Sequence, residues 1–234
     1  MLQNQSFNQM NQEKKKVAVV LSGCGVFDGT EIHEAVLTLL AVEEENASWH
    51  CFAPKIEQLH VIDHAKGEVV EGEKRDVFSE SARISRGSEK LSELSEYDPN
   101  DFDCLLFPGG FGGAKNLSDF AIKGPEGIAL DSVEQAVRST HSLAKPIGFI
   151  CITPASVGAL TLGGDQVTLT IGNDRETASF IEALGSRHED CSVEDIVVDY
   201  QNKIVSTPAY MLGPSLKQVR IGIAKLVRQV LSMT

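Results

Sequence analysis

The sequence predicts an α/β fold, in which helices sandwich a mostly parallel sheet that carries small β-hairpin insertions. Short apolar runs recur without polar alternation, as expected of strands buried on both faces, and helical segments separate them. The 234 residues can bury one sizeable core. We therefore assign residues 17–234 to a single domain. Residues 1–16, rich in Gln and Asn and ending in three lysines, are expected to form a disordered tail.

The composition and net charge of the chain exclude some classes of binding partner. A net charge of -12 argues against nucleic acid or an anionic membrane as a partner and leaves small molecules and proteins. The five cysteines are an odd number and match no disulfide or zinc spacing, so we expect no metal and a cytoplasmic protein. The tail has no features of a secretory or transit signal.

The first third of the chain begins with a buried strand at 17–22 and a turn, GCGVFDGT. A helix is predicted over 31–45, and Asp28 with Glu31 has the spacing of a capping box, which gives Glu31 a purely structural alternative to any chemical role. The apolar side of this helix is expected to hold Ile32, Val36, Leu39 and Leu40.

The next segment combines a strand at 49–53 with an insertion that resembles a small hairpin, LHVID and EVVE around AKG. A short helix over 79–86 would carry Arg83 and Arg86 three residues apart. Both guanidinium groups could then meet an anionic group, or the pair is simply a solvated face.

A strand over 102–107 runs into PGGFGG, where glycines permit close backbone approaches, and a helix over 127–143 follows. The strand at 146–150 then ends at Cys151, and Thr153 and Pro154 are suited to start a helix. Cys151 therefore lies at a strand-to-helix corner, where free N–H groups would stabilise a thiolate. The alternative is a packing role, which we assign to the other buried cysteines, Cys51 and Cys104.

The last third predicts a strand at 167–170, a helix over 175–184, a hairpin around 200–203 and a long helix from residue 214. This final helix has an apolar stripe that either covers the sheet or forms a homodimer interface. The stripe comprises Val219, Ile223, Leu226 and Val230.

Parallel sheets bind ligands outside the carboxyl ends of their strands, and four of the loops converge there. These loops are GCGVFDGTE, PGGFGG, the turn at Cys151 and STPAY. Cys24 is expected near this site, either as a reactive partner or as a packing residue. The full set of expected pocket residues is Cys24, Gly109, Arg83, Arg86, His188 and Pro208.

Four segments, LSGCGVFDGTEIHEAVLTLL, FPGGFGGAKNLS, PIGFICITPA and IVSTPAYM, together resemble the enhancing lycopene biosynthesis proteins of the class I glutamine-amidotransferase-like, DJ-1/PfpI superfamily. The resemblance spans nearly the whole chain after the tail and implies a flavodoxin-like fold. It also implies that Cys151 is the nucleophile of the elbow and that Glu31 hydrogen-bonds it from the first helix. The backbone N–H groups of Gly110 and Ile152 would form the oxyanion hole.

The chain departs from the glutaminases of this superfamily, because it has no histidine followed by Pro-Glu after the elbow. His188 is the only histidine downstream of Cys151, and it follows the wrong element. Glutaminase activity is therefore not expected. Some family members are described as glyoxalases, so the resemblance implies a cysteine-dependent, glutathione-independent glyoxalase acting on small 2-oxoaldehydes such as glyoxal.

The resemblance further implies a homodimer without a cofactor, in a family linked to isoprenoid biosynthesis. A different class of function stays open. The same cysteine pocket would suit a non-enzymatic sensor of oxidants or carbonyls, or a regulatory protein that binds a metabolite.

Overall fold

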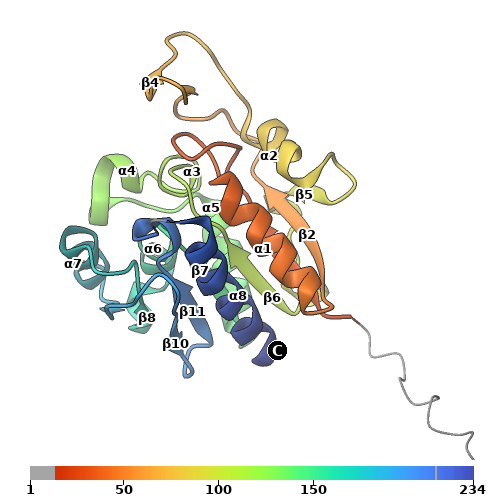
Figure 1. Cartoon of the computed structure of the whole chain (residues 1–234), viewed down its shortest axis with the longest axis vertical. Coiled ribbons are helices and arrows are strands. Elements are labelled where there is room, and N and C mark those ends of the chain that lie inside the picture. The colour runs from red at the N-terminus through yellow and green to blue at the C-terminus, as the bar shows by residue number, and fades with distance from the viewer. Residues whose placement is uncertain (1–13, 214) are drawn as a thin grey trace, which may run out of the picture.

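Seven strands form the central sheet of the computed structural model, which describes residues 14–213 and 215–234. The strand order is β10-β11-β7-β6-β1-β2-β5, with β10 antiparallel to β11 and the other pairs parallel. The mostly parallel sheet predicted from the sequence is thus confirmed (Figure 1). Its strands are β1 (Lys16–Val20), β2 (Ser48–Ala53), β5 (Leu91–Glu93), β6 (Cys104–Phe107), β7 (Ile147–Ile150), β10 (Val197–Asp199) and β11 (Ile204–Thr207).

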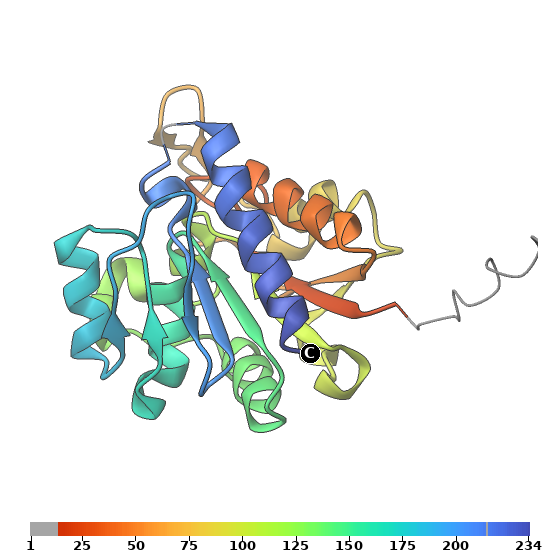
Figure 2. The same ribbon diagram turned by 60° about the horizontal axis from the view of Figure 1, so that its bottom comes forward.

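Helices cover both faces of this sheet, as Figure 2 shows. On β1, Val17 and Val19 belong to the core shared with α1, α2 and α8, whereas Ala18 and Val20 belong to the core on the other face. This alternation explains why the strand is apolar throughout. The helices are α1 (Ile32–Glu44), α2 (Val77–Ser85), α3 (Gly112–Lys115), α4 (Phe120–Lys123), α5 (Asp131–Ser142), α6 (Leu160–Leu162), α7 (Arg175–Ala183) and α8 (Leu216–Ser232).

Two small strand pairs lie outside the central sheet. The predicted hairpin insertion is present as antiparallel β3 (Ile62–Asp63) and β4 (Glu68–Val69), and it projects beyond α1 and α2 in Figure 1. The strand predicted at 167–170 is shorter than expected, and as β8 (Thr168–Leu169) it pairs with β9 (Arg187–His188) rather than with the main sheet.

The predicted apolar side of α1 is largely wrong. Leu39 is buried, but Ile32, Val36 and Leu40 are 44%, 49% and 42% exposed. The face that packs on the sheet is made of smaller residues together with one charged residue. Its buried members are Glu34, Ala35, Thr38, Leu39, Ala41 and Val42.

The apolar stripe of α8 packs inside the chain. All four of its residues are fully buried, in the core that α8 shares with α1 and the sheet. The stripe therefore covers the sheet, and it cannot serve as the dimer interface that we considered. The helix itself begins at Leu216, with Ser215 accepting a hydrogen bond from the Gln218 amide as its cap.

Other boundaries differ modestly from the prediction. Lys16 already belongs to β1, and residues 1–13 of the predicted tail lie outside the described residues. The helix predicted from residue 127 begins at Asp131, and the edge strand β5 was not predicted. Within the described chain, no helix is long and apolar enough to cross a membrane.

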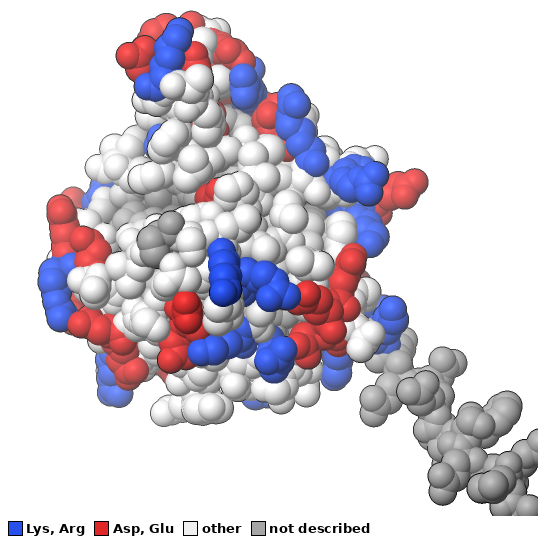
Figure 3. All heavy atoms as spheres, viewed as in Figure 1, with Lys and Arg blue, Asp and Glu red and all other residues white. Residues whose placement is uncertain are grey.

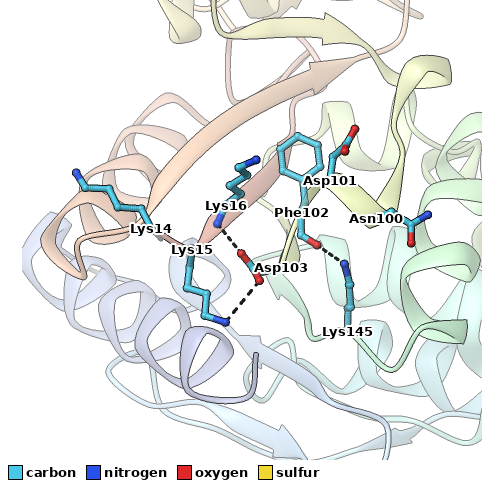
Figure 4. A pocket seen from close by; sticks show the side chains of 8 residues that line it. All are labelled: Lys14, Lys15, Lys16, Asn100, Asp101, Phe102, Asp103 and Lys145. Atoms are coloured by element: carbon cyan, nitrogen blue, oxygen red, sulfur yellow. Dashed lines mark hydrogen bonds and ion pairs between the residues drawn. The ribbon is translucent and has the colours of Figure 1, made fainter. Parts of the chain in front are cut away.

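Lysines line a hollow at the amino-terminal edge of the sheet, and their ion pairs and hydrogen bonds connect neighbouring strands (Figure 4). Lys15 lies 3.5 Å from Asp103, whose carboxylate also accepts the Lys16 amide at 2.7 Å. The Lys145 ammonium donates to the carbonyls of Pro99 and Phe102. These contacts tie the starts of β1, β6 and β7 together, at the edge opposite the expected site.

Candidate active site

The elbow at Cys151 has the predicted position but a different local construction. Cys151 follows β7 directly, adopts a left-handed φ of 64° and is 7% exposed. The following turns are π-helical over Pro154–Ala159. Thr153 makes no side-chain cap; its hydroxyl lies 2.9 Å from the Ile150 amide and 3.0 Å from the Phe107 carbonyl. The hydroxyl thus joins the ends of β6 and β7 under the cysteine.

The carboxyl group that contacts Cys151 belongs to Glu34, and the expectation for Glu31 was wrong by three residues. Glu34 is fully buried and hydrogen-bonds the Cys151 thiol. Its two oxygens also accept the backbone N–H groups of Gly109, at 3.0 Å, and Tyr210, at 3.1 Å. Three segments far apart in the sequence therefore meet at one carboxyl group.

Glu31 is the N-cap of α1, where its carboxylate accepts the Glu34 amide at 2.7 Å. The proposed capping box with Asp28 does not form. Asp28 is buried and instead accepts the amide of Ile62 at 2.8 Å, which ties the hairpin insertion to the turn after β1. The cap holds the start of α1 in the position that delivers Glu34 to the cysteine.

Two backbone amides point at the sulfur as the resemblance implied. The N–H groups of Gly110 and Ile152 both hydrogen-bond the Cys151 thiol. Such donors also suit an oxyanion that forms on a carbon attached to sulfur. The loop after β6 and the elbow therefore contribute one donor each.

The glycines of PGGFGG are required by close approaches at this point. A methyl group at Gly109 would overlap Cβ of Cys151 and Oε2 of Glu34, and one at Gly110 would overlap the backbone at Gly29 and Glu31. Gly110 also has a φ of +100°. Only glycine lets this loop place its amides against the cysteine and the carboxyl group.

Burial controls the protonation of the pair. It raises the pKa of Glu34 to about 8, although the amides of Tyr210 and Gly109 act in the opposite direction. Burial and the neighbouring Glu34 also raise the pKa of the Cys151 thiol, against the effect of its two amide donors. The expected low-pKa thiolate is therefore corrected: the resting pair holds its protons at neutral pH, because both groups are shielded from water.

A second cluster of titratable groups lies at the start of α1. Nδ1 of His33 is 2.9 Å from the Tyr210 hydroxyl and 3.9 Å from Oε1 of Glu31. Burial, followed by the charges of Glu31 and Glu34, raises the pKa of Tyr210, so its phenol stays protonated. Tyr210 thus contacts Glu34 through its amide and His33 through its side chain. Glu34 and Tyr210 were not predicted from the sequence as site residues, whereas His33 had been considered only as an alternative base should Glu31 prove to be a cap.

Pro208, two residues before Tyr210, is buried. It precedes Ala209, whose φ of 43° turns the chain so that the Tyr210 amide faces Glu34. The contribution of the STPAY loop is therefore a backbone donor.

Cys24, Arg83 and Arg86 line a different hollow, between α1 and α2, together with the exposed residues of α1. Arg83 is paired with Glu80 at 2.8 Å, and burial raises the pKa of Cys24. The structure therefore does not group these three residues with Cys151.

His188 lies on β9 with its side chain 2% exposed. Its Nε2 accepts the amide of Ile171 at 3.3 Å, and burial lowers its pKa. The acceptor nitrogen of this histidine is already occupied, so it does not replace the missing base of the glutaminases.

A hollow of about 530 Å³ opens beside the elbow at Ile152. The hairpin insertion and the segment around α3 and α4 form its walls, and its lining is mostly apolar: Phe27, Ile62, Gly67, Phe111, Ala114, Lys115, Phe120, Ala121, Ile152 and Phe180. On the face seen in Figure 3, charged side chains lie around the rim and in a band across the lower part, and the area above that band is largely uncharged. No group of three His, Cys, Asp or Glu side chains in residues 14–213 and 215–234 is arranged to hold a metal ion.

No known family model matches the chain, but individual relatives cover nearly all of it. The ES1 protein homolog of Rattus norvegicus is 43% identical over 94% of this chain and 85% of its own length. Glutamine amidotransferase-like class 1 domain-containing protein 3 of Homo sapiens is 43% identical over 94% of this chain and 83% of its own. The ES1 protein of Danio rerio is 33% identical over 96% and 88%.

Solved structures agree with these relatives. An isoprenoid biosynthesis protein with an amidotransferase-like domain from Ehrlichia chaffeensis is 39% identical and superposes with a TM-score of 0.85 over 94% of this chain and all of its own. A DJ-1 superfamily protein from Salmonella typhimurium, at 20% identity, shares the fold with a TM-score of 0.55 over 93% of this chain and 91% of its own.

All three ES1-type relatives are named as mitochondrial proteins. This finding overturns the cytoplasmic location expected from the sequence. The expectation depended on the five cysteines, which are all free in the structure. Free thiols indicate a reducing environment, and they do not distinguish one reducing compartment from another.

Proposed function

The chain belongs to the family of ES1 proteins and glutamine amidotransferase-like class 1 domain proteins, within the DJ-1/PfpI superfamily, and from this premise we propose that it is a cysteine-dependent glyoxalase. It would convert small 2-oxoaldehydes such as glyoxal into 2-hydroxy acids without glutathione. The observation that carries the proposal is the buried hydrogen bond between Cys151 and Glu34, a carboxyl group with a pKa of about 8. A carboxyl group tuned near neutrality is suited to moving protons.

The reaction begins from the minority of molecules in which Glu34 is ionised, a form that a pKa of about 8 makes accessible near neutral pH. In this form the Cys151 thiol gives its proton to the Glu34 carboxylate and its sulfur adds to the aldehyde carbon. The carbonyl electrons move to the oxygen, and the Gly110 and Ile152 amides are placed to stabilise this oxyanion. The oxyanion then takes the proton from Glu34. The product is a hemithioacetal, and the Glu34 carboxylate is regenerated.

The next step moves hydrogen between the two carbons. Glu34 removes the C–H proton of the hemithioacetal and the electrons move to the neighbouring carbonyl oxygen, which gives an enediolate. Glu34 returns the proton to the second carbon, while the hydroxyl proton of the first carbon passes to the second oxygen. The result is a thioester of the 2-hydroxy acid on Cys151. Water then adds to the thioester carbon and the thiol leaves, so one water is consumed for each aldehyde.

Amide hydrolysis of glutamine receives no such support. The amine leaving group must be protonated, and a histidine beside the nucleophile does this in the triads that cleave amides. His188 is engaged with Ile171 instead. The finer assignment to the enhancing lycopene biosynthesis proteins is likewise our proposal. Its support is the four sequence motifs and the isoprenoid biosynthesis protein of Ehrlichia chaffeensis.

The test is formation of 2-hydroxy acid from a panel of 2-oxoaldehydes, with glutathione omitted. Cys151→Ser and Glu34→Gln are expected to lower turnover by about two orders of magnitude or more. Cys191→Ser and Glu89→Gln, at partly exposed and exposed positions elsewhere, are matched controls that should turn over normally.

Formation of one equivalent of adduct on Cys151 without turnover would contradict the proposed glyoxalase activity. It would favour the alternative, a non-enzymatic sensor of oxidants or carbonyls. Normal turnover in well-folded Glu34→Gln would contradict the proton transfer assigned to that residue.

A further inference from the structure

We infer that His33, supported by Glu31 and Tyr210, is the base that activates water for hydrolysis of the acyl group on Cys151. This inference rests on the proposed function and deepens it, because the scheme above leaves the last step without a base. The motivating observation is the His33–Tyr210–Glu31 cluster at the start of α1, which is connected to Cys151 through Glu34.

The cluster is built into the same loops as the Cys151–Glu34 pair. Glu31 uses one carboxylate oxygen, Oε2, to hold the Glu34 amide, and its other oxygen faces Nδ1 of His33 at 3.9 Å. Tyr210 donates its amide to Glu34 and places its hydroxyl 2.9 Å from the same Nδ1. The imidazole is therefore positioned by two residues that also position Glu34.

This role requires one tautomer of His33, the one with its proton on Nδ1. With its proton on Nδ1, the imidazole donates to the Tyr210 hydroxyl, and Nε2 keeps a free lone pair. The side chain is 57% exposed, so Nε2 is open to water. The Tyr210 hydroxyl would then orient the imidazole from one side, and water would meet Nε2 on the other, with the Glu31 carboxylate nearby at 3.9 Å from Nδ1. The histidine has the role that it has in hydrolase triads, but it is supplied by the first helix.

In the step itself, Nε2 takes a proton from water as its oxygen bonds to the thioester carbon. The carbonyl electrons move to the oxygen held by Gly110 and Ile152, and they return as the carbon–sulfur bond breaks. The departing sulfur takes the proton from His33 or from Glu34. Glu31 offsets the positive charge that forms on the imidazole between these events. The other titratable groups that face the imidazole or its two neighbours are Glu34 and Tyr210.

The experiment separates loading of Cys151 from its release. Glyoxal is mixed with the wild type, His33→Gln or His141→Gln. The reactions are quenched at intervals, and the mass of the intact protein is measured by mass spectrometry. Glutamine keeps a side chain that can hydrogen-bond Tyr210 but cannot act as a base. His141, in the last turn of α5, is the matched control. Hydroxylamine identifies the thioester, because it cleaves that adduct.

His33→Gln is expected to load at the wild-type rate and to release the acid about two orders of magnitude more slowly, so that a hydroxylamine-sensitive adduct accumulates on Cys151. Tyr210→Phe, which keeps the backbone amide to Glu34, should slow release by a smaller factor. His141→Gln should behave as wild type. Equal slowing of loading and release in His33→Gln would overturn the inference, since it would indicate a general structural effect.

A second arm does not depend on glyoxalase activity. Cys151 is acetylated with p-nitrophenyl acetate, and loss of the acetyl group is followed in the same variants. Slow loss confined to His33→Gln supports the inference, even if the wild type forms no 2-hydroxy acid and the proposed function fails. Loss at the wild-type rate in His33→Gln, or a wild-type Cys151 that cannot be acetylated, overturns the inference.

Discussion

At the scale of the residue, the site depends on one carboxyl group held in an unusual state. Glu34 is fully buried, accepts two backbone amides and hydrogen-bonds the Cys151 thiol. An ionised carboxylate would normally carry this many contacts. Burial outweighs them, so the group is protonated at neutral pH and carries a dissociable proton beside the sulfur.

This protonation predicts a particular dependence of stability on pH. The ordinary pKa of 4.5 applies to Glu34 in the unfolded chain, against about 8 in the folded protein. Between these values the folded state binds the extra proton, so the free energy of unfolding falls as pH rises, by up to about 1.4 kcal/mol per pH unit. Glu34→Gln should lose this contribution, whereas exposed Glu89→Gln should keep it. Urea unfolding across pH 5 to 8 measures the slopes, and equal slopes in all three proteins would contradict the assignment.

The sequence placed Cys151 at the corner and missed the carboxyl group that contacts it for a physical reason. A strand running into a corner and a proline-started helix marks Cys151 locally, and the motif resemblance adds Gly110 and Ile152. Glu31 and Glu34 are separated by less than one turn, and both stand where a helix is beginning. The signal that distinguishes them is the spacing of Glu34, Thr38 and Val42, which places a charged residue on the sheet-facing stripe.

At the scale of the element, the elbow is held by a side chain rather than by helix capping. The Thr153 hydroxyl satisfies the Ile150 amide at the end of β7 and bonds the Phe107 carbonyl at the end of β6. Both strand ends are buried, so neither group has water as an alternative partner. The hydroxyl therefore fixes the relative positions of the cysteine and the PGGFGG loop.

Thr153→Val keeps the shape and removes the hydroxyl, so we expect a loss of stability of about 1–3 kcal/mol from the unpaired Ile150 amide. Thr161→Val is the matched control, because the Thr161 hydroxyl only bonds carbonyls of its own helix. Chemical denaturation measures both. A loss in Thr153→Val no larger than in the control would show that the elbow is held by other contacts.

Element type could be predicted along most of the chain, but the facing of α1 could not. Ile32, Val36 and Leu40 have helical spacing and were taken as the core side, yet each is more than 40% exposed. The actual core side contains Ala35 and Thr38, because small side chains let the helix lie close to the sheet and α8. Hydrophobicity alone ranks these two stripes in the wrong order.

At the scale of the whole molecule, the homodimer stays a prediction with a changed location. The stripe of α8 is used up inside the chain, so it offers no surface to a second copy. The exposed stripe of α1 lies next to Trp49 and Ile84 in the hollow between α1 and α2, which makes a larger apolar surface. The net charge of -12 adds a requirement for apolar contact, because identical copies repel each other.

Light scattering at micromolar concentration is expected to give the mass of a dimer for the wild type and of a monomer for Val36→Glu. Val69→Glu, at an equally exposed position in the hairpin insertion, should remain dimeric. A monomeric mass for the wild type would contradict the prediction of a homodimer. A dimeric Val36→Glu would move the interface away from α1.

The left-handed backbone conformation at Cys151 is expected to lower the thermal stability of the protein. A residue with a Cβ is strained at a φ of 64°, and the surrounding loops enforce that conformation. Cys151→Gly and Cys151→Ala both remove the thiol, but only the glycine variant loses the strain. We therefore expect Cys151→Gly to melt about 2–4 °C above Cys151→Ala, corresponding to about 1 kcal/mol. Calorimetry that found the alanine variant equally thermostable would mean that the corner is relaxed. A higher melting temperature for Cys151→Gly would show that the fold gives up some thermal stability to hold the Cys151 sulfur at this corner.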